Sequence, residues 1–367
     1  MNLKDVATGR LSSQQIAETS FQSVKDLVSW MGVMQAQDFP MAKWAVGIRL
    51  PGSTLKQVNA AIDTGEIIRT HLLRPTWHFV SADDIYWMLE LSAGRIRTAA
   101  RSHMKELEIS DTILSKSYSI IEKLLQGGQH RSREDIMAEL LRNNIQTNEN
   151  RSSLILMQAE MAGLVCSGAS LGNKQTYALL EERVPRPPAL SKEEALARLA
   201  SRYFYSHCPA TLQDFTWWSG LTAGDARQAL QLVQDDLISE TIGSQTFWMP
   251  GTFMIPEKRK RPSVHLLPAF DEFVISYADR SAILTRENHR RSVSRNGLFR
   301  PVIVVNGQVT GLWKRTIAGD NLNIQTGFFE VHSNTLRNSI ASAAKNLGRF
   351  MSLKPVINFE TESEESK

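Results

Sequence analysis

Hydrophobic side chains recur three and four positions apart near the start of the chain, and short β-rich segments follow them. This spacing predicts helices over residues 14–19, 23–31 and 55–63. Residues 67–73 and 76–80 are rich in β-branched and aromatic side chains, which is typical of strands. Helices followed by a two-strand unit are the outline of a winged helix, although other folds share that outline.

A second stretch of the chain repeats this order. Apolar faces, capping residues and glycine stops predict four helices and then a hairpin, over residues 85–91, 117–125, 134–142, 154–162, 164–167 and 176–180. Glycines at 127, 128 and 163 end two of these helices. The pattern is again that of a winged helix.

The linker Pro185-Arg186-Pro187-Pro188 is stiff and marks the clearest boundary in the chain. Three helices and two short strands are predicted after it, over residues 191–205, 211–218, 223–233, 238–242 and 246–248. The glycine turn that starts at Gly220 separates two of the helices and fits a helix-turn-helix. A generic three-helix unit explains this block as well.

The last block is rich in predicted strands and ends with one helix, over residues 264–267, 273–275, 302–305, 309–313, 323–325 and 335–350. Asn306-Gly307 is a strong hairpin signal between two of the strands. These signals suggest a small barrel or sheet domain. The sequence therefore predicts an α+β chain of four blocks and a tail, at residues 1–83, 84–185, 189–257, 262–359 and 360–367.

Composition places the chain among ordinary soluble globular proteins, with 42% hydrophobic and 22% charged residues among 367. No apolar run approaches the roughly 18 residues of a transmembrane helix, and residues 1–5 lack the apolar core of a signal peptide, so we expect a cytoplasmic protein with no membrane partner. Cys166 and Cys208 are expected to be buried thiols. Because no metal, P-loop, GxGxxG or GxSxG pattern occurs, we expect no cofactor and no metal.

Charge is distributed unevenly along the chain, whose net charge is +4. Residues 258–315 carry twelve Lys or Arg and four Asp or Glu, whereas residues 360–367 carry four Glu and one Lys. The acidic tail lacks apolar residues and is expected to be disordered. A basic stripe is typical of nucleic-acid or acidic-lipid binding, or of a solvated face. Three helix-turn-helix-like units beside it favour nucleic acid.

Gln35 and Gln37 are separated by one small residue, Ala36, in the polar segment that follows the second predicted helix. In an extended or turn conformation, positions i and i+2 project to the same side. The two amides could then grip one water molecule or two edges of one base. Alternatively, they are solvated glutamines at the end of a helix.

Several motifs occur in a characteristic order: Met34–Gln37 with Trp44–Arg49, Arg69–His78, Asp214–Leu221, Leu267–Phe273 with Tyr277–Arg280, Phe299–Val302 and Gly311–Lys314. Together they resemble the AlkZ-like winged-helix DNA glycosylases, relatives of the YcaQ interstrand-crosslink glycosylases. Each motif alone is weak, but the ordered set is specific and covers nearly the whole chain.

The resemblance implies three tandem winged helices and a C-terminal β-barrel, curled around duplex DNA. It implies excision of N-alkylated purines, including bases held in interstrand crosslinks, with Gln35 and Gln37 as the catalytic Gln-x-Gln pair. The residue between the two glutamines is usually a larger aliphatic than Ala36. Asp38 stands one place late for the Gln-x-Asp pattern of the YcaQ branch.

The implied chemistry suits two amides. Alkylation at N7 or N3 makes the purine cationic, so the base departs as a neutral leaving group without being protonated. The enzyme then needs to orient a water molecule and to stabilise an oxocarbenium-like transition state. Amides accept hydrogen bonds but take up no proton near neutral pH. Because no lysine stands in the motif, we expect a monofunctional glycosylase without a Schiff-base step.

Candidate DNA contacts are the residues Lys43, Arg69, Arg74, Thr76, His78, Lys258, Arg259, Lys260, Arg261 and Arg300. Each could instead be a solvated or structural side chain. Asp271 with Arg300 is expected to form a structural or DNA-orienting pair. Trp44, Trp217 and Trp218 are expected in the core rather than as stacking platforms for bases.

The expected partner is double-stranded DNA carrying alkylated purines, with no protein partner required. A rival hypothesis is a non-catalytic winged-helix DNA-binding protein, such as a regulator. A third is a glycosylase specialised for one natural toxin adduct, acting in self-resistance.

Overall fold

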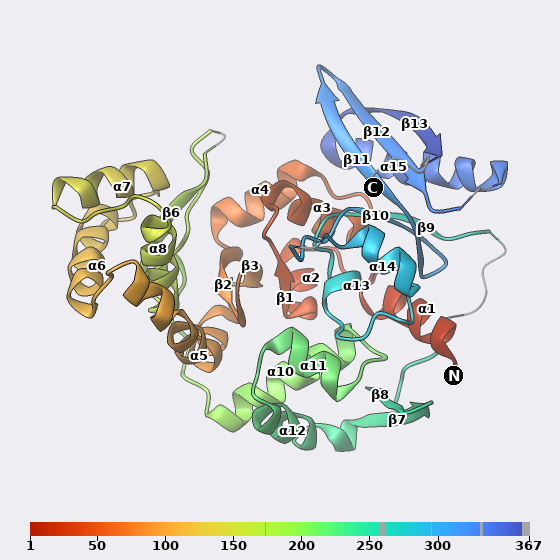
Figure 1. Ribbon diagram of the computed structural model, residues 1–367, viewed down its shortest axis with the longest axis horizontal. Helices are drawn as coiled ribbons and strands as arrows, with labels where there is room; N and C mark the ends of the chain where they lie inside the picture. Colours follow the sequence, from red (N-terminus) through yellow and green to blue (C-terminus); the bar gives the residue numbers. More distant parts are fainter. Residues whose placement is uncertain (173, 257–260, 295, 331–332, 362–367) are drawn as a thin grey trace. The chain divides into compact units, whose positions relative to one another are not determined.

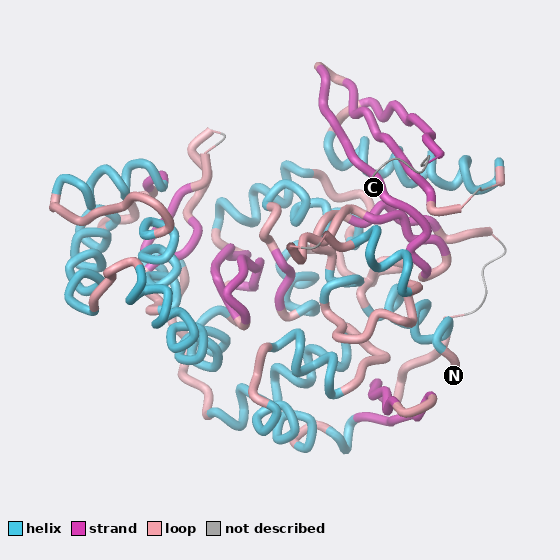
Figure 2. Tube along the Cα trace, viewed as in Figure 1, coloured by secondary structure: helices cyan, strands magenta, loops and turns pink. Residues whose placement is uncertain are grey.

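Two compact units make up the structure, a computed structural model that describes residues 1–172, 174–256, 261–294, 296–330 and 333–361. The first unit combines residues 1–59 with 197–367, and the second is residues 60–196. Helices and strands are mixed in both units, so the fold is α+β, as the sequence predicted (Figures 1 and 2). The boundaries of the four predicted blocks stay a prediction.

The first unit begins with three helices and a short strand, followed by the start of a fourth helix: α1 (Leu3–Ser13), α2 (Val24–Met31), β1 (Val33–Gln35), α3 (Phe39–Arg49) and α4 (Leu55–Thr64). The helix predicted over residues 14–19 is wrong, because α1 has already ended there. The Asn2 side chain accepts hydrogen bonds from the Lys4 and Asp5 backbone amides, which starts the helix at Leu3. Gln15 then adopts a positive φ of 60°, a backbone conformation that a right-handed α-helix does not contain.

A five-stranded sheet lies in the same unit, in the order β13-β12-β11-β10-β9. Its strands are β9 (Val264–Leu267), β10 (Val302–Val305), β11 (Gln308–Ala318), β12 (Asn321–Phe328) and β13 (Lys354–Thr361). Neighbouring strands are antiparallel except β12 and β13, which are parallel and joined through helix α15 (Asn334–Met351). Figure 2 shows these strands in magenta. In the described strands, β13 and β9 are the two edges of an open sheet. The barrel stays a prediction.

Two local signals in this region had different outcomes. The Asn306-Gly307 hairpin is confirmed, and both residues have positive φ, at 50° and 81°, as a type I′ turn requires. The strand predicted over residues 273–275 is wrong, because this segment is the short helix α13 (Glu272–Ile275). The Asp271 carboxylate caps it by accepting the Phe273 backbone amide at 2.9 Å, and this cap outweighs the β propensity of Phe273 and Val274.

The rest of the first unit is mostly helical. Its elements are α10 (Lys192–Ser206), which begins in the second unit, α11 (Leu212–Ser219), α12 (Ala223–Gln231), the 3₁₀ turn Gln234–Asp236, the hairpin strands β7 (Leu237–Ile242) and β8 (Gln245–Pro250), and α14 (Arg286–Ser292). The predicted glycine turn is confirmed, since Gly220 ends α11 in the left-handed conformation. Between α10 and α11 lies a buried aromatic cluster of Tyr203, Phe204, Phe215 and Trp218.

The second unit contains a hairpin, a long helix and a small sheet. Its elements are β2 (Ile67–Leu72), β3 (Arg74–Ser81), α5 (Ile85–Glu106), α6 (Asp111–Leu125), β4 (Arg131–Ser132), α7 (Arg133–Arg142), α8 (Arg151–Met161), β5 (Val165–Ser167), β6 (Thr176–Leu179) and α9 (Leu180–Arg183). The three strands pair in the order β4-β6-β5. Both predicted hairpins are confirmed, whereas α5 extends far beyond the predicted residues 85–91.

Both cysteines are buried free thiols, as predicted. Burial raises the pKa of Cys166 and of Cys208 to about 12, so both thiols stay protonated near neutral pH. Among the described residues, no helix combines the length and the apolar character that a membrane crossing needs.

A buried ion pair joins distant parts of the first unit. Arg49, at the end of α3, donates to both carboxylate oxygens of Asp271 at 2.8 and 2.9 Å, and both side chains are completely buried. The same guanidinium donates to Gln14 at 2.8 Å. Asp271 therefore pairs with Arg49, and the predicted pairing with Arg300 is wrong because Arg300 is exposed. A bidentate pair of this kind fixes the position of α3 against α13.

Asp271→Ala should destabilise the first unit strongly, because it leaves the Arg49 charge buried without its counterion. We expect the free energy of unfolding to fall by about 3–5 kcal/mol, measured by urea denaturation followed through tryptophan fluorescence. The double change Arg49→Met with Asp271→Leu should cost less than the single change. Glu139→Gln, which breaks a surface pair with Arg142, should cost under about 1 kcal/mol. A loss below that value for Asp271→Ala would contradict this role.

Candidate functional site

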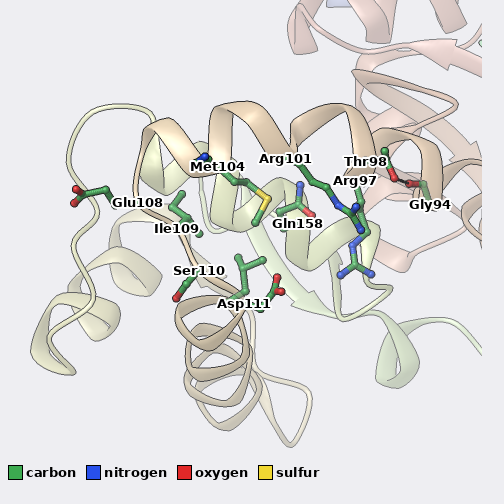
Figure 3. A pocket seen from close by; sticks show the side chains of 12 residues that line it. Gly94, Arg97, Thr98, Arg101, Met104, Glu108, Ile109, Ser110, Asp111 and Gln158 are labelled. Atoms are coloured by element: carbon green, nitrogen blue, oxygen red, sulfur yellow. Dashed lines mark hydrogen bonds between the residues drawn. The ribbon is translucent and has the colours of Figure 1, made fainter.

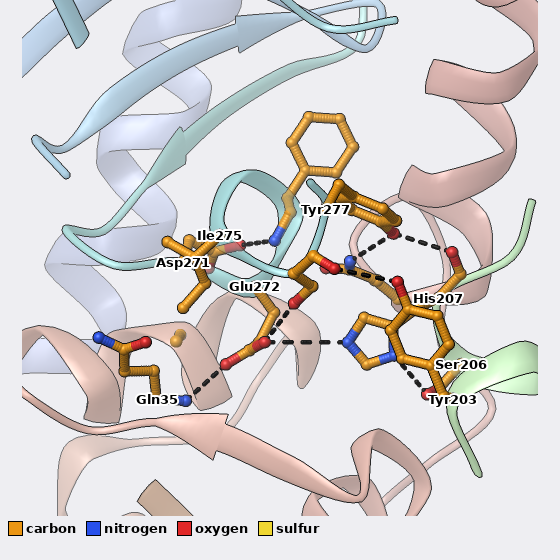
Figure 4. Close-up of polar contacts among 12 residues, drawn as sticks. Gln35, Tyr203, Ser206, His207, Asp271, Glu272, Ile275 and Tyr277 are labelled. Carbon is orange, nitrogen blue, oxygen red and sulfur yellow. Dashed lines mark hydrogen bonds and ion pairs between the residues drawn. The ribbon is translucent and has the colours of Figure 1, made fainter. Parts of the chain in front are cut away.

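Gln35 is the last residue of β1, and its backbone is anchored by a carboxylate from a distant part of the chain. The Gln35 amide N donates to Oε1 of Glu272 at 2.5 Å. Gln35 is 9% exposed and Glu272 is 1% exposed. Figure 4 shows the Gln35 side chain extending away from Glu272, so the contact holds the backbone and leaves the side-chain amide separate from it.

Glu272 is satisfied on its other oxygen as well. Ser276, one turn further along, donates its hydroxyl to Oε2 of Glu272. The Nε2 atom of His207 lies 3.9 Å from the same oxygen. Burial lowers the pKa of His207, which favours the neutral imidazole. A buried carboxylate is costly unless hydrogen bonds compensate for its lost hydration, and here donors approach both oxygens.

A chain of hydrogen bonds runs from Asp271 to the backbone of His207, whose imidazole faces Glu272; Figure 4 shows Asp271, Tyr277, His207 and Glu272 of this network. Asp271 binds Arg49, and Arg49 donates to Gln14. Gln14 donates to the Tyr277 hydroxyl at 2.9 Å, and that hydroxyl donates to the backbone carbonyl of His207 at 2.9 Å. Since His207 faces Glu272, two adjacent acidic residues hold α3 and β1 from one buried network.

The segment between β1 and α3 carries the rest of the glutamine motif. Ala36 is fully buried, whereas Gln37 is exposed. Asp38 caps α3 by accepting the Met41 backbone amide at 3.1 Å. The Asp38 carboxylate is thus used as a helix cap, in line with its position one place late for a Gln-x-Asp pattern. Burial of Ala36 between the two glutamines fits its small side chain.

The predicted DNA contacts near this motif differ in exposure. Lys43 is half-buried on α3, and its ammonium lies 4.0 Å from the centre of the Phe39 ring. This geometry is a cation–π contact one turn apart on the helix. The role of Lys43 in DNA binding stays a prediction.

Four other predicted contacts belong to the hairpin of the second unit. Arg69 is 9% exposed, stacks on Trp77 at 4.0 Å and donates to Gln175 at 2.7 Å, which is the environment of a structural arginine. His78 is fully buried, with Nδ1 2.9 Å from the carbonyl oxygen of Thr76. Arg74 and Thr76 are half-buried. Burial favours the structural alternative for Arg69 and His78, and their contact with DNA stays a prediction.

The remaining predicted contacts fall in and beside the basic run. Lys258, Arg259 and Lys260 lie outside the described residues. Arg261 and Arg300 are described, and both are exposed. Their exposure is compatible with phosphate contacts, which stay a prediction.

The tryptophans divide between core and surface. Trp44 and Trp218 are 2% and 0% exposed, so the expectation that they belong to the core is confirmed. Trp217 is 48% exposed, which contradicts that expectation. Its indole N–H donates to the Ile275 carbonyl at 2.8 Å, so one edge is fixed while the ring keeps an open face. On α11, Trp217 and Trp218 point to different sides because they are adjacent.

The second unit carries a groove of about 1020 Å³ along α5 that the sequence analysis missed. Its lining includes Arg97, Arg101 and Lys105, together with the acidic residues Glu108 and Asp111. Figure 3 shows Arg97 and Arg101 extending from α5 into the groove. The sequence contains the signal for this basic face, because Arg97, Arg101 and Lys105 are four positions apart and such residues lie on one face of a helix.

The sequence analysis also missed Glu272, His207 and Arg49 as parts of the site. They lie far from Gln35 in sequence, and no local spacing brings them together. Within the described part of the chain, no group of three or more His, Cys, Asp or Glu side chains is arranged to hold a metal ion. The motif itself carries two side-chain amides, on a segment whose ends are held by Glu272 and by the Asp38 cap.

Comparison with known proteins agrees with the resemblance in the sequence. The sequence profile of the family "DNA glycosylase AlkZ-like" matches residues 28–350. The chain is 21% identical over 334 residues to an interstrand DNA cross-link repair glycosylase of Streptomyces sahachiroi, covering 85% of this chain and 87% of that protein. The solved structure of S. sahachiroi DNA glycosylase AlkZ has the same fold, with a TM-score of 0.80 and 18% identity over 98% of this chain and all of that one. This chain therefore belongs to the AlkZ-like DNA glycosylase family.

Proposed function

We propose that this protein is a monofunctional DNA glycosylase that hydrolyses the N-glycosidic bond of cationic N-alkylated purines. In this proposal Gln35 and Gln37 hold the attacking water. The observation that carries it is the Gln-Ala-Gln segment, whose backbone is anchored by the buried Glu272 in a chain of a glycosylase family. An anchored segment can present amides in a fixed geometry, which is what catalysis by orientation requires.

The reaction needs little acid–base chemistry. The alkylated purine is positively charged, so the base leaves as a neutral molecule when the glycosidic bond breaks. Water attacks the anomeric carbon and loses a proton to solvent, which leaves an abasic site. The side-chain carbonyl oxygens of Gln35 and Gln37 accept the water's hydrogens and so direct its lone pair toward the sugar. This assistance is sufficient only for activated, cationic substrates.

The expected architecture follows the same proposal. Helices and hairpins occur in three successive groups: α2 to β3, α6 to β6, and α10 to β8. We assign each group to a winged helix and the sheet of β9 to β13 to the C-terminal barrel, all curled around duplex DNA. Because the related S. sahachiroi protein is described as a cross-link repair glycosylase, bases in interstrand crosslinks are candidate substrates for this chain as well.

Replacing both glutamines should abolish excision and leave DNA binding intact. On a duplex with one N7-methylguanine, we expect Gln35→Ala with Gln37→Ala to lower the single-turnover rate by at least about 100-fold. Alkali cleavage of abasic sites measures the rate, and fluorescence anisotropy measures the affinity for DNA. Asn59→Ala, at a residue outside the motif, is the matched amide control. Excision that survives the double change would refute the two-glutamine mechanism.

Binding to undamaged duplex should depend steeply on salt, since the protein is expected to bind mostly phosphates. The slope of log affinity against log salt becomes shallower by about 0.9 for each phosphate that the protein no longer neutralises. Arg101→Gln and Arg300→Gln, at exposed positions, should each reduce the slope by about one. Lys123→Gln, at an exposed position of α6 outside the groove, should leave it unchanged. Equal slopes for all three variants and the unchanged protein would show that neither arginine binds DNA phosphates.

A further inference from the structure

We propose that Glu272 is a positioning residue for the glycosylase reaction, acting through the backbone of Gln35. By accepting the Gln35 amide N–H, it sets where the Gln35 side chain stands relative to the sugar. This inference rests on the proposed function, and it adds a residue that touches neither DNA nor the attacking water.

The contact between Glu272 and Gln35 joins residues 237 positions apart in the sequence. Charge-assisted bonds between a backbone N–H and a carboxylate are shorter and stronger than neutral ones. Ser276 donates its hydroxyl to the other oxygen of the same carboxylate, so both oxygens accept a hydrogen bond.

The anchor acts at the end of a short strand, where the glutamine motif begins. β1 is only three residues long and ends at Gln35. Three residues later, Asp38 begins α3 as its N-cap. Glu272 therefore fixes one end of the Gln35–Gln37 segment and the Asp38 cap fixes the other. Because a displacement of about 1 Å in a catalytic group can cost about 100-fold in rate, removal of the anchor should appear in the chemical step.

A purely structural role for Glu272 predicts a different outcome. The adjacent pair Arg49–Asp271 already ties α3 to α13 by a bidentate contact. Replacement of Glu272 should therefore leave this tie in place and change the excision rate more than it changes the affinity for DNA. A structural role would lower stability and leave the rate per folded molecule unchanged.

Three variants separate these possibilities. Glu272→Asp keeps the carboxylate but withdraws it by one methylene from the Gln35 amide. Glu272→Gln keeps an oxygen at the same reach, and this oxygen can still accept the Gln35 N–H. Glu193→Asp makes the same change at an exposed position of α10, outside this network, so it is the matched control.

The experiment measures single-turnover excision of N7-methylguanine from a duplex at saturating protein, with DNA affinity and the melting temperature recorded for each variant. We expect Glu272→Asp to lower the maximal rate by at least about tenfold with an unchanged half-saturation concentration. Glu272→Gln and Glu193→Asp should stay within about threefold of the unchanged protein. A maximal rate of Glu272→Asp equal to that of the unchanged protein would overturn the inference.

A spectroscopic signature tests the contact without reference to activity. In protein labelled with ¹⁵N-glutamine, the Gln35 amide proton should resonate far downfield because it binds a carboxylate, and this shift should disappear in Glu272→Asp. An unshifted Gln35 resonance would overturn the inference. The two claims fail in different ways. If the unchanged protein excises no base while the Gln35 resonance still responds to Glu272→Asp, the contact exists but the proposed glycosylase function is wrong. If the protein excises the base but Glu272→Asp changes neither the rate nor the resonance, only the role of Glu272 is wrong.

Discussion

Two adjacent acidic residues, Asp271 and Glu272, hold the glutamine motif to the rest of the first unit. Asp271 receives the guanidinium of Arg49 from α3, and Glu272 receives the backbone amide of Gln35 from β1. Both carboxylates are buried, so each requires its partners to offset lost hydration. The cost of desolvation makes the arrangement specific, because a shift of β1 or α3 would remove a partner from one of these buried carboxylates.

This anchoring connects fold and chemistry. The two amides can offer only orientation and polarity, because neither takes up a proton. Catalysis by orientation depends on how narrowly the groups are held. Glu272 supplies that constraint at Gln35, and hydrogen bonds from Arg49 through Gln14 and Tyr277 hold the neighbouring Asp271 and α3. The proposed chemistry, restricted to substrates that are already activated, requires such a firmly held pair of amides.

Local signals in the sequence predicted the local structure well. The hairpin at Asn306-Gly307 and the turn at Gly220 were found because backbone geometry at those positions requires particular residues. Propensity failed at residues 273–275, where the Asp271 cap directs the chain into a helix. The partner of Asp271 was also mistaken. Arg49 lies 222 positions away, and no spacing rule reaches across such a separation. The two glutamines were predicted from their motif and stay a prediction, whereas the positions of Glu272 and His207 beside that motif required the folded chain.

The proposed function is that this chain, with its Gln-Ala-Gln segment, releases a cationic alkylpurine from DNA. Mass spectrometry of a duplex carrying one N7-methylguanine, incubated with the protein, tests it most directly. If the protein is a monofunctional glycosylase, we expect free 7-methylguanine together with an unbroken strand that carries one abasic site. If the protein binds this duplex and a crosslinked duplex but releases no base from either, the proposed function is wrong and a non-catalytic DNA-binding protein is favoured.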